Sequence, residues 1–536
     1  MEISNPSQHH ADAFQLLGYT SGPTFYYLPK GAKMVIALRS DQHVEGKLIS
    51  IASKQWWEQN YGGDWRLAAN AMIQLSYRVG IFNPDRVRGR GAWWDNGIST
   101  LHIGNRLIVS GEEKELGSST HYIYEAAEPI RINYKNPLTV GEAERFSKIC
   151  DMLTWEQKIS SRYLAGWCAI APICGALNWR PHIWVTGAKG SGKSWTAENI
   201  VTPIVGDIGL FVLASTTEAG IRQELGHDAR PLIFDEIDGS GEKAKARIDS
   251  VLDLARPAAS EGKAKLLKGT VTGKAMSFKV RFCAAFFSIG VAATRSQDES
   301  RVTVLSMAVG FNPEKFKLLE GMTAELITEE YIQRFTARSV RLIPEIRESY
   351  RIFKAAAAKL LGNQRAGDQI GALLAGAWSL HSDKAVTVTE AVAWLNKEDW
   401  AENKANGEHT DEIKCLSHLL QSIIKSPAEG SMRDFSVADL VDMASGRKYS
   451  PDNDRNSAIN TLGMNGLRGD PDGLVVSSSH SAIARLLKGT DWDKNWKLTL
   501  GRLAGAYPTR RAVRFGSVRT HGVTIPYDKE EDDLDR

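Results

Sequence analysis

The spacing of hydrophobic residues changes along the chain and divides it into five predicted regions. In residues 1–140, short apolar runs predict strands around one amphipathic helix near residues 65–79, so we expect a separate α+β domain. The strand-like runs are FYYLP, KMVIALRS, HVEGKLISIAS and STLHIGNRLIVSG. Residues 141–180 hold two runs with helical spacing, GEAERFSKICDML and SRYLAGWCAIAPICGAL.

Residues 181–311 alternate strand-like and helical runs, which predicts an α/β domain. The strand-like runs are HIWVT, GLFVLAS, PLIFD and RFCAAFFSIGVA, and TEAGIRQEL lies among them with helical composition. From residue 312 to about residue 405 the pattern is helical.

The last region, residues 406–536, begins with three helical runs, DEIKCLSHLLQSII, SVADLVDMA and DRNSAINTLGMNGL, and continues with strand-like runs. This order matches a winged helix, a common DNA-binding module, and a protein-protein module fits nearly as well. A basic surface would come from Arg455, Arg510, Arg511, Arg514 and Arg519. The terminal EEDDLDR predicts an acidic tail.

Composition narrows the function without identifying it. The 536 residues suffice for about three or four domains, each large enough to bury a core. The 66 basic and 63 acidic residues exclude a globally basic coating protein, so any nucleic acid must be held by local patches. The five cysteines lack metal-ligand spacing, and neither a secretion signal nor a membrane-spanning run is recognisable. We therefore expect a cytoplasmic protein with reduced thiols and no membrane partner.

One segment carries a complete phosphate-binding pattern. Residues 187–194 are GAKGSGKS, which matches G-x-x-x-x-G-K-[ST] and follows directly on the strand-like HIWVT. Glycines permit the tight turn that aims backbone N–H groups at phosphate oxygens, Lys193 supplies a charge to the β and γ phosphates, and Ser194 offers a hydroxyl to Mg²⁺. The predicted ATP-binding residues are Gly187, Ala188, Lys189, Gly190, Ser191, Gly192, Lys193, Ser194 and Trp195.

A second motif, PLIFDEID, ends a hydrophobic run in two carboxylates, Asp235 and Glu236. An ATPase needs an aspartate for its Mg²⁺ and a carboxylate that orients the attacking water at this sheet edge. Without the phosphate loop, the two side chains would be interpreted as solvated loop carboxylates. With it, we predict that Asp235 binds the metal and that Glu236 is the catalytic base.

Together these motifs resemble the ATPase domain of superfamily 3 helicases, an AAA+-type α/β fold, and most of all the phage and prophage primase-helicases related to the poxvirus type. The residues that carry the resemblance occupy most of residues 181–307 and are GAKGSGKS, STTEAGIRQEL, PLIFDEID, AKLLKGTVTGKAMSFKVR, SIGVA and DESRVTVL. RGRGAWWD and GDQIGALLAGA outside that span are also similar to the family. The resemblance implies a ring, a hexamer, in a bacterial host cell.

The resemblance also implies roles for two further residues. Ser288 ends a strand where the superfamily usually has Asn, and would be the sensor of the γ phosphate. Arg301 would be an arginine finger that acts on the ATP of the neighbouring subunit. Arg301 could instead pair locally with Asp298 or Glu299. The family also implies a helical collar at residues 141–180 and a helical lid at residues 312–405, where Arg338 or Arg341 could sense nucleotide or form salt bridges.

The lysine-rich segment from Lys263 to Lys279 has the composition of a hairpin with a glycine-containing turn. In superfamily 3 helicases a hairpin at this point grips the DNA backbone inside the ring. Lys268 and Lys274 are the candidates for that grip, because a sequence-independent motor needs charge on phosphate. The alternative is an ordinary solvated hairpin.

A final candidate is RVRGRGAWWD near the N-terminus. Arg86, Arg88 and Arg90 followed by Trp93 and Trp94 suit a nucleic-acid loop, because guanidinium groups hold phosphates and indoles stack on bases. An interdomain joint is an equally good interpretation, because paired tryptophans are often core residues.

The sequence thus predicts an ATP- and Mg²⁺-dependent DNA helicase or translocase of a phage or mobile element, acting as a ring on single-stranded or forked DNA. Two other functions stay open. One is a nucleotide-switched assembly, signalling or loading ATPase of a mobile-element or defence system. The other is a replication initiator in which ATP promotes assembly alone.

Overall fold

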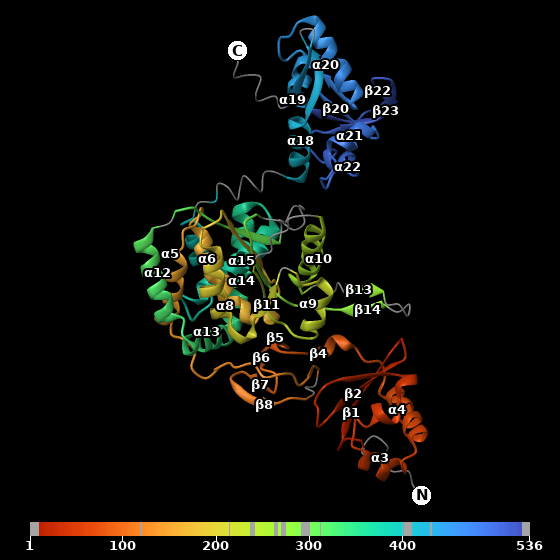
Figure 1. Ribbon diagram of the computed structural model, residues 1–536, viewed down its shortest axis with the longest axis vertical. Helices are drawn as coiled ribbons and strands as arrows, with labels where there is room; N and C mark the ends of the chain where they lie inside the picture. Colours follow the sequence, from red (N-terminus) through yellow and green to blue (C-terminus); the bar gives the residue numbers. More distant parts are fainter. Residues whose placement is uncertain are drawn as a thin grey trace. The chain divides into compact units, whose positions relative to one another are not determined.

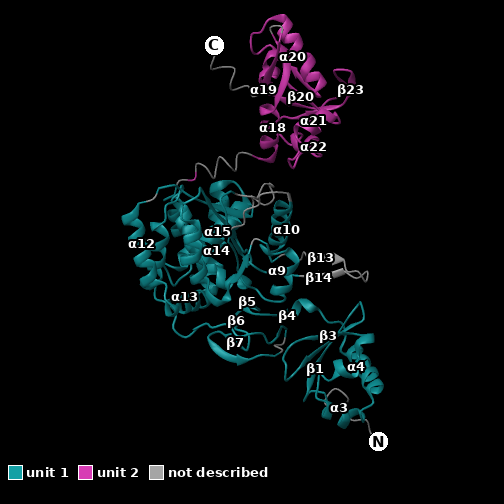
Figure 2. Cartoon of the chain, viewed as in Figure 1, with its two compact units in different colours: residues 1–398 teal, residues 399–536 magenta. Residues whose placement is uncertain are grey.

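The computed structural model describes residues 10–117, 121–213, 215–235, 242–261, 266–269, 275–290, 301–310, 312–398, 400, 410–428 and 431–527. The chain divides into two compact units, residues 1–398 and 399–536 (Figure 2). In the described residues no helix is long and apolar enough to cross a membrane. All five cysteines are buried and free.

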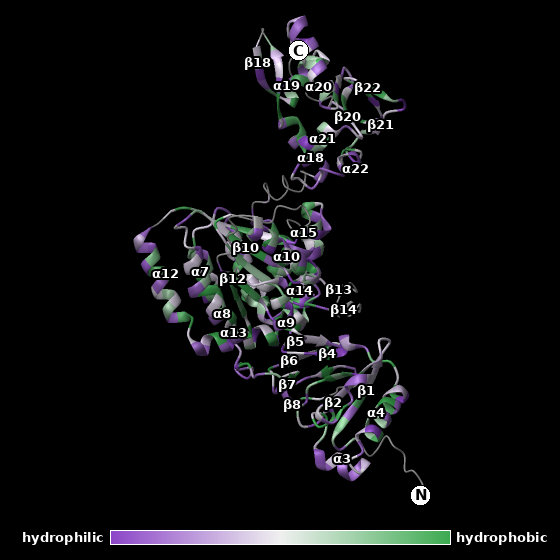
Figure 3. Ribbon diagram, turned by 45° about the vertical axis from the view of Figure 1, so that its right-hand side comes forward, coloured by the Kyte–Doolittle hydropathy of each residue, from purple (hydrophilic) through white to green (hydrophobic). Residues whose placement is uncertain are grey.

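The first unit begins with a three-stranded antiparallel sheet of β1 (Phe14–Thr20), β2 (Thr24–Pro29) and β3 (Ile36–Arg39). The helices α3 (Lys54–Tyr61) and α4 (Trp65–Val79) supply the rest of its core, in which Phe25, Trp57 and Met72 are fully buried. Figure 3 shows α3 as largely hydrophilic, in agreement with its sequence KQWWEQNY, of which Trp57 is the buried residue.

The run HVEGKLISIAS, predicted to be a strand, contains the short helix α2 (Glu45–Leu48) instead. Its buried hydrophobic residues include Leu48 and Ile51, which are three positions apart and join the same core. That spacing places both side chains on one side of a helical turn, whereas in a strand they would point to opposite faces.

A second antiparallel sheet follows, with the order β5 (Gly91–Asp95), β6 (Ile98–His102), β7 (Arg106–Val109) and β8 (Glu112–Glu115). Beside it, β4 (Val87–Arg88) pairs with β9 (Ile123–Tyr124). Both lie below the central core in Figure 1.

The central sheet is wholly parallel and has the order β11-β12-β15-β10-β16. Its strands are β10 (His182–Gly187), β11 (Leu210–Leu213), β12 (Leu232–Asp235), β15 (Ala284–Phe287) and β16 (Val302–Met307). The runs of β10, β12 and β15 are almost continuously hydrophobic because helices cover a parallel sheet on both faces. This mixed α/β architecture was predicted from the sequence and is confirmed.

The strand order makes β10 the switch point of the sheet. The chain leaves β10 for the far edge, returns through β12 and β15, and then crosses to β16 on the other side of β10. In such sheets ligands bind outside the carboxyl ends of the strands at the switch point. The fold therefore predicts a binding site at the end of β10, where the phosphate-loop pattern begins.

One face of this sheet packs against α9 (Glu218–Leu225) and α10 (Glu242–Ala258). Across three strands, Phe234, Phe286 and Trp184 lie in register, with ring centroids 5.0 Å apart between neighbours. Such offset aromatic contacts add about 0.5–1.5 kcal/mol each beyond their buried area. They hold the strand ends rigidly just before the sheet edge.

Helices α5 (Val140–Met152) and α6 (Ile159–Ile170) lead into the sheet, and α12 (Pro313–Leu326), α13 (Glu329–Arg341), α14 (Ile343–Leu361), α15 (Gln364–Ser379) and α16 (Val388–Leu395) follow it. Helices α6 and α15 cross closely, because a Cβ on Gly166 or Gly376 would collide with the backbone of the other helix. Arg338 is buried and donates to Asp383 and three backbone carbonyls, so it forms a structural ion pair.

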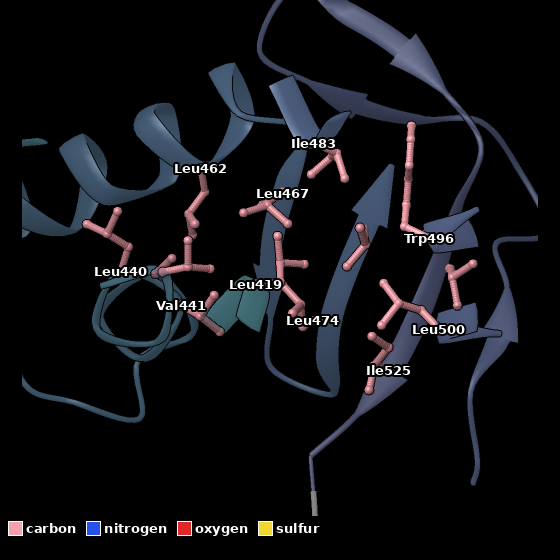
Figure 4. Close-up of a cluster of buried hydrophobic side chains, with 14 of the residues drawn as sticks. Leu419, Leu440, Val441, Leu462, Leu467, Leu474, Ile483, Trp496, Leu500 and Ile525 are labelled. Atoms are coloured by element: carbon pink, nitrogen blue, oxygen red, sulfur yellow. The ribbon is translucent and has the colours of Figure 1, made fainter. Parts of the chain in front are cut away.

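The second unit contains α18 (Asp411–Gln421), the hairpin β17 (Ile423–Ala428) and β18 (Ser431–Ser436), α19 (Val437–Ser445) and α20 (Asp452–Met464). An antiparallel sheet follows in the order β19 (Leu467–Asp470), β20 (Gly473–Ser477), β24 (Gly522–Pro526) and β21 (Tyr507–Pro508). Short helices α21 (Ser481–Leu486) and α22 (Trp496–Leu500) complete it. Figure 4 shows its core, where Leu419, Leu440 and Leu462 of the helices meet Leu474 and Ile525 of the sheet.

Candidate nucleotide-binding site

The phosphate-loop pattern forms a turn between β10 and a helix. Gly190 and Gly192 have φ angles of +82° and +94°, which side chains rarely adopt. A Cβ on Gly187 would lie 2.5 Å from the carbonyl oxygen of Met307, so the backbone approaches β16 too closely for any other residue. From Lys193 a helical run continues through α7 (Lys193–Thr196), the π turn η4 (Ala197–Val201) and α8 (Thr202–Val205). Its N-terminal N–H groups favour an anion.

Lys193 lies inside this turn, where its side chain is largely buried. Its ammonium donates to the carbonyl oxygens of Gly187 at 2.7 Å and of Ala188 at 2.9 Å. These bonds draw the loop around a positive charge. Ser194 is exposed on the first helical turn, and its neighbour Trp195 packs edge-on against Phe316. Ala188, Lys189 and Gly190 are exposed at the outer rim of the loop.

Asp235 is the last residue of β12 and lies at the same edge of the sheet. Its neighbour Phe234 pairs through Phe286 with Trp184, so Asp235 is level with Val185 in β10. The Oδ1 atom of Asp235 is buried and has no hydrogen-bond partner within the described residues. A buried carboxylate oxygen without a partner is a costly feature that a bound cation would compensate. Glu236, the predicted catalytic base, lies outside the described residues.

A cavity of about 370 Å³ adjoins the loop. Three segments distant in sequence line it: the end of α5, the end of β16 and the start of α12. Its lining residues are Met152, Leu153, Thr154, Gly190, Ser191, Gly192, Lys193, Ser194, Trp195, Met307, Ala308, Gly310, Asn312, Lys315, Phe316 and Leu319. Sequence reasoning identified the loop and Trp195 but missed the α5 and α12 residues. No motif marks them, because only folding brings them to the loop.

Ser288, the predicted γ-phosphate sensor, has a hydroxyl that is already engaged. Its oxygen accepts a hydrogen bond from Trp184 Nε1 at 2.7 Å, and its hydrogen is donated to the carbonyl oxygen of Gly290. The residue is 3% exposed. A hydroxyl has one hydrogen to donate, so in this structure Ser288 supports the aromatic row. A sensor role would require the hydroxyl to exchange its bond to Gly290 for one to the nucleotide, and it stays a prediction.

Arg301 lies at the opposite edge of the sheet from the phosphate loop. It immediately precedes β16, whose first residue, Val302, pairs with His182 at the beginning of β10. Five residue steps along β10 separate that end from Gly187, a distance of about 17 Å. Arg301 therefore cannot reach the nucleotide site of its own chain. Its suggested local partners Asp298 and Glu299 lie outside the described residues.

The same amino-terminal edge contains a dense set of satisfied polar contacts. His182 donates from Nε2 to the Ala255 carbonyl oxygen at 2.9 Å and accepts at Nδ1 from the Ala284 N–H at 3.0 Å. Burial, helped by the positive charges of Arg180 and Arg301, lowers the pKa of His182 to about 4. The neutral ring thus joins α10, β10 and β15.

The predicted lysine hairpin contains β13 (Leu266–Gly269) and β14 (Ala275–Phe278), which pair antiparallel with Lys268 opposite Met276. Lys274 lies outside the described residues. At the base of the hairpin, Glu261 accepts from Lys279 at 2.8 Å, from Arg281 at 3.1 Å and from Arg180. These three cations hold the pKa of Glu261 well below its usual range even though burial opposes them. Glu261 therefore joins both legs of the hairpin to the segment that enters β10.

The arginines of RVRGRGAWWD are part of an internal joint. Arg88 is buried, pairs with Asp95 at 3.2 Å and stacks on the rings of Trp93 and Tyr122. Arg90 pairs with Asp228 at 2.7 Å, just before β12.

The glycines of the same motif let its backbone meet that segment directly. The Gly89 N–H donates to the His227 carbonyl oxygen at 3.0 Å, and Gly91 bridges to Ala229. Arg86 is partly exposed and donates to the His121 carbonyl oxygen. Of the two interpretations, the structure supports the joint, and Arg88 and Arg90 are corrected from nucleic-acid contacts to structural residues.

No protein-family model and no curated protein matches this chain. Among solved structures, the chain is similar to one described as the active helicase Cch of SCCmec type IV, with 13% identity, coverage of 97% of this chain and 94% of that chain, and a TM-score of 0.47. It is also similar to the C-terminal region of NrS-1, with 10% identity, coverage of 97% and 100%, and a TM-score of 0.34. A full-length MCM homologue from Methanopyrus kandleri matches with 13% identity, coverage of 55% and 73%, and a TM-score of 0.28.

Because these TM-scores lie below 0.5, the class of the protein rests on its own residues. A parallel sheet whose switch-point strand runs into a glycine turn, a buried lysine and a helix N-terminus defines a phosphate-loop α/β fold.

Proposed function

We propose that this chain is an ATP-dependent motor on DNA of the superfamily 3 type. The observation that carries the proposal is the phosphate loop at the switch point of the parallel sheet, with the unpartnered Asp235 oxygen at the same edge. The donor set fits Mg·ATP, because Mg²⁺ prefers oxygen ligands and Ser194 and Asp235 supply a hydroxyl and a carboxylate.

In this proposal the loop amides and Lys193 hold the phosphates, and the lysine exchanges its carbonyl partners for phosphate oxygens. Ser194 and Asp235 would hold Mg²⁺, which neutralises charge on the phosphates when bound. Glu236 would take the proton of the attacking water. The cavity beside the loop would receive the base and ribose, with Phe316 and Trp195 as its aromatic wall.

Three further features support the proposal that ATP hydrolysis drives movement along DNA. The hairpin of β13 and β14 lies in chain order between β12, which ends at Asp235, and β15, which ends just before Ser288. Lys268 and Lys274 would grip phosphates from it. Arg301 lies about 17 Å along β10 from its own loop, which fits an arginine finger for a neighbouring subunit in a ring. Glu261 would transmit movement between the hairpin and β10.

The nucleotide assignment is tested by ATPase assays with and without single-stranded DNA, together with mass photometry. Lys193→Ala should abolish nucleotide binding, because it removes the charge at the phosphates. Glu236→Gln should bind nucleotide and assemble normally but stop turnover. Lys317→Ala, an exposed lysine on α12 outside the cavity lining, is the control and should behave like the parent. Turnover by Glu236→Gln at the parental rate would show that Glu236 is not the base.

The motor assignment is tested with a forked duplex. Lys268→Ala/Lys274→Ala should retain basal ATPase activity and lose DNA stimulation and strand separation together. The matched control is Lys243→Ala/Lys245→Ala, which removes two exposed lysines from α10. If the hairpin variant unwinds the fork as well as the parent does, the signalling or loading ATPase becomes the better interpretation.

A further inference from the structure

The second unit contains a small hairpin with an unusual charge arrangement. β22 (Val513–Phe515) and β23 (Val518–Thr520) pair with each other outside the four-stranded sheet. Arg514 lies directly opposite Arg519 in their antiparallel register. Like charges in this position destabilise an antiparallel pair. Folding alone therefore gives no reason for the two arginines.

These arginines have no counter-ion among the residues of the unit that the structure describes. Arg510, Arg511, Arg514 and Arg519 are all exposed. In residues 410–428 and 431–527, no carboxylate lies within 4.0 Å of any of their guanidinium groups. Other arginines of the same unit are paired, as Arg447 is with Asp442 and Arg468 with Asp470. Arg455 and Arg485 are also exposed without such a partner in the described residues, but residues 510–519 hold four of these arginines close together in the chain.

The hairpin is also held in place, so the charges are preorganised. Phe515 is 1% exposed, and a Cβ on Gly463 of α20 would lie 2.7 Å from the Gly516 nitrogen. Arg514 and Arg519 donate through Nε to the carbonyl oxygens of Gly516 and Ala512. These bonds fix the planes of both guanidinium groups and use only Nε, so the terminal nitrogens remain for a ligand. Figure 1 shows the hairpin at the margin of the unit beside β20.

The adjoining surface belongs to α20. Asn456 and Asn460 are exposed on this helix, as are Ile459 and Met464. The turn of the hairpin touches the end of the same helix, where a Cβ on Gly516 would lie 3.5 Å from the Met464 nitrogen. The exposed face of α20, which also carries Asp452 and Arg455 near its start, thus adjoins the turn of the arginine-bearing hairpin.

We propose that the arginine hairpin, defined as residues 510–520, together with α20 is a docking surface for the phosphodiester backbone of double-stranded nucleic acid. Guanidinium groups match phosphate in charge and in their forked geometry, and an anion between Arg514 and Arg519 would relieve their repulsion. A duplex groove admits a helix or a two-stranded ribbon. Single strands are usually bound by stacking on exposed aromatic rings, whereas the aromatic residue of this hairpin, Phe515, is buried.

The test uses the full chain without nucleotide and measures binding to a labelled duplex and to one of its single strands by fluorescence anisotropy over a range of NaCl concentrations. Arg514→Gln/Arg519→Gln should weaken duplex binding about tenfold or more at low salt. The slope of log K against log salt should become shallower by about two, one for each lost phosphate contact. Single-strand binding should change little.

The control is Arg447→Gln/Arg468→Gln, which removes two arginines that are already paired and should leave duplex binding unchanged. Thermal unfolding gives an independent readout. The hairpin variant should unfold at the parental temperature or higher, because a like-charge pair has been removed. Parental duplex affinity and salt slope in the folded variant would overturn the proposal, as would an equal loss on both nucleic acids or a lowered unfolding temperature.

Discussion

The two edges of the central sheet differ in what their polar side chains contact. At the carboxyl edge, Lys193 is held by carbonyl oxygens, Ser194 is exposed and Asp235 has a buried oxygen with no hydrogen-bond partner in the described part of the chain. At the amino edge, Glu261 binds three cations and both ring nitrogens of His182 are hydrogen-bonded.

This difference separates a binding edge from a structural edge. A buried polar atom without a partner costs stability, and in the described residues Nε of Arg180 at the amino edge is such an atom as well as Oδ1 of Asp235. The amino edge is therefore distinguished by the contacts through which it holds several elements together. The amino edge joins α10, β10, β15 and the base of the hairpin, and the carboxyl edge is where we propose that nucleotide binds. Arg301 is the exception to be explained, because it lies at the structural edge and is proposed to act on another chain.

The largest effect is expected for Arg301, the residue of the amino edge that is proposed to act on another chain. Arg301→Ala should lower kcat by about 10³-fold or more, because an arginine finger neutralises transition-state charge. Nucleotide affinity measured without turnover should stay near the parental value. Mixing these subunits with Lys193→Ala subunits should restore part of the ATPase activity, because some interfaces then contain both intact halves. Arg351→Ala, an exposed arginine paired with Glu348, serves as the control. No recovery at any ratio, with co-assembly verified, would place Arg301 in the structural edge.

A smaller effect is expected at the binding edge. Asp235→Asn should lower Mg²⁺-dependent turnover about 100-fold, because a carboxylate ligand contributes several kcal/mol to a metal-assisted step. The free energy of unfolding should not fall, since Oδ1 of Asp235 is buried and makes no hydrogen bond within the described residues. Chemical denaturation measures the free energy of unfolding, and ATPase titration with Mg²⁺ measures the metal dependence of turnover. A loss of stability with unchanged metal dependence would make Asp235 a structural residue.

Glu261→Gln should act in the opposite way and reduce stability more than nucleotide affinity. Its side chain is about one-third exposed (35%), so solvent screens the ion pairs and the expected loss is about 1–3 kcal/mol. Urea denaturation and nucleotide binding measure the two effects. Glu348→Gln, which breaks an exposed pair with Arg351, should cost less than about 1 kcal/mol. A large fall in nucleotide affinity without a change in stability would contradict the structural assignment.

The smallest expected effect is a pH dependence from His182. Because its pKa is about 4 in the folded protein against 6.5 ordinarily, the unfolded chain gains a proton first as the pH falls. The stability that the protein gains from keeping His182 neutral is fully present above pH 6.5. It is lost progressively from pH 6.5 towards pH 4, by about 1.4 kcal/mol per pH unit. His182→Gln cannot titrate, so its stability should fall less than that of the parent between pH 6.5 and 5.5. Equal slopes for both proteins would contradict this assignment.

The sequence by itself determined the parts of this protein that local chemistry dictates. The phosphate loop follows from glycine spacing and its position after a buried strand, and α4 and the helices of the second unit follow from periodicity. The run HVEGKLISIAS was mispredicted because short apolar runs satisfy strand and helix spacing alike.

Tertiary structure decided what each polar residue is for. Two glycine- and arginine-bearing stretches, RVRGRG and RRAVRFG, look alike in the sequence. In the first, Arg88 and Arg90 meet Asp95 and Asp228 inside the joint, whereas in the second, Arg514 meets another arginine. The cavity wall from α5 and α12, the engaged hydroxyl of Ser288 and the distance of Arg301 from its own loop were likewise unpredictable. Each depends on contacts between residues far apart in the chain, which no local pattern encodes.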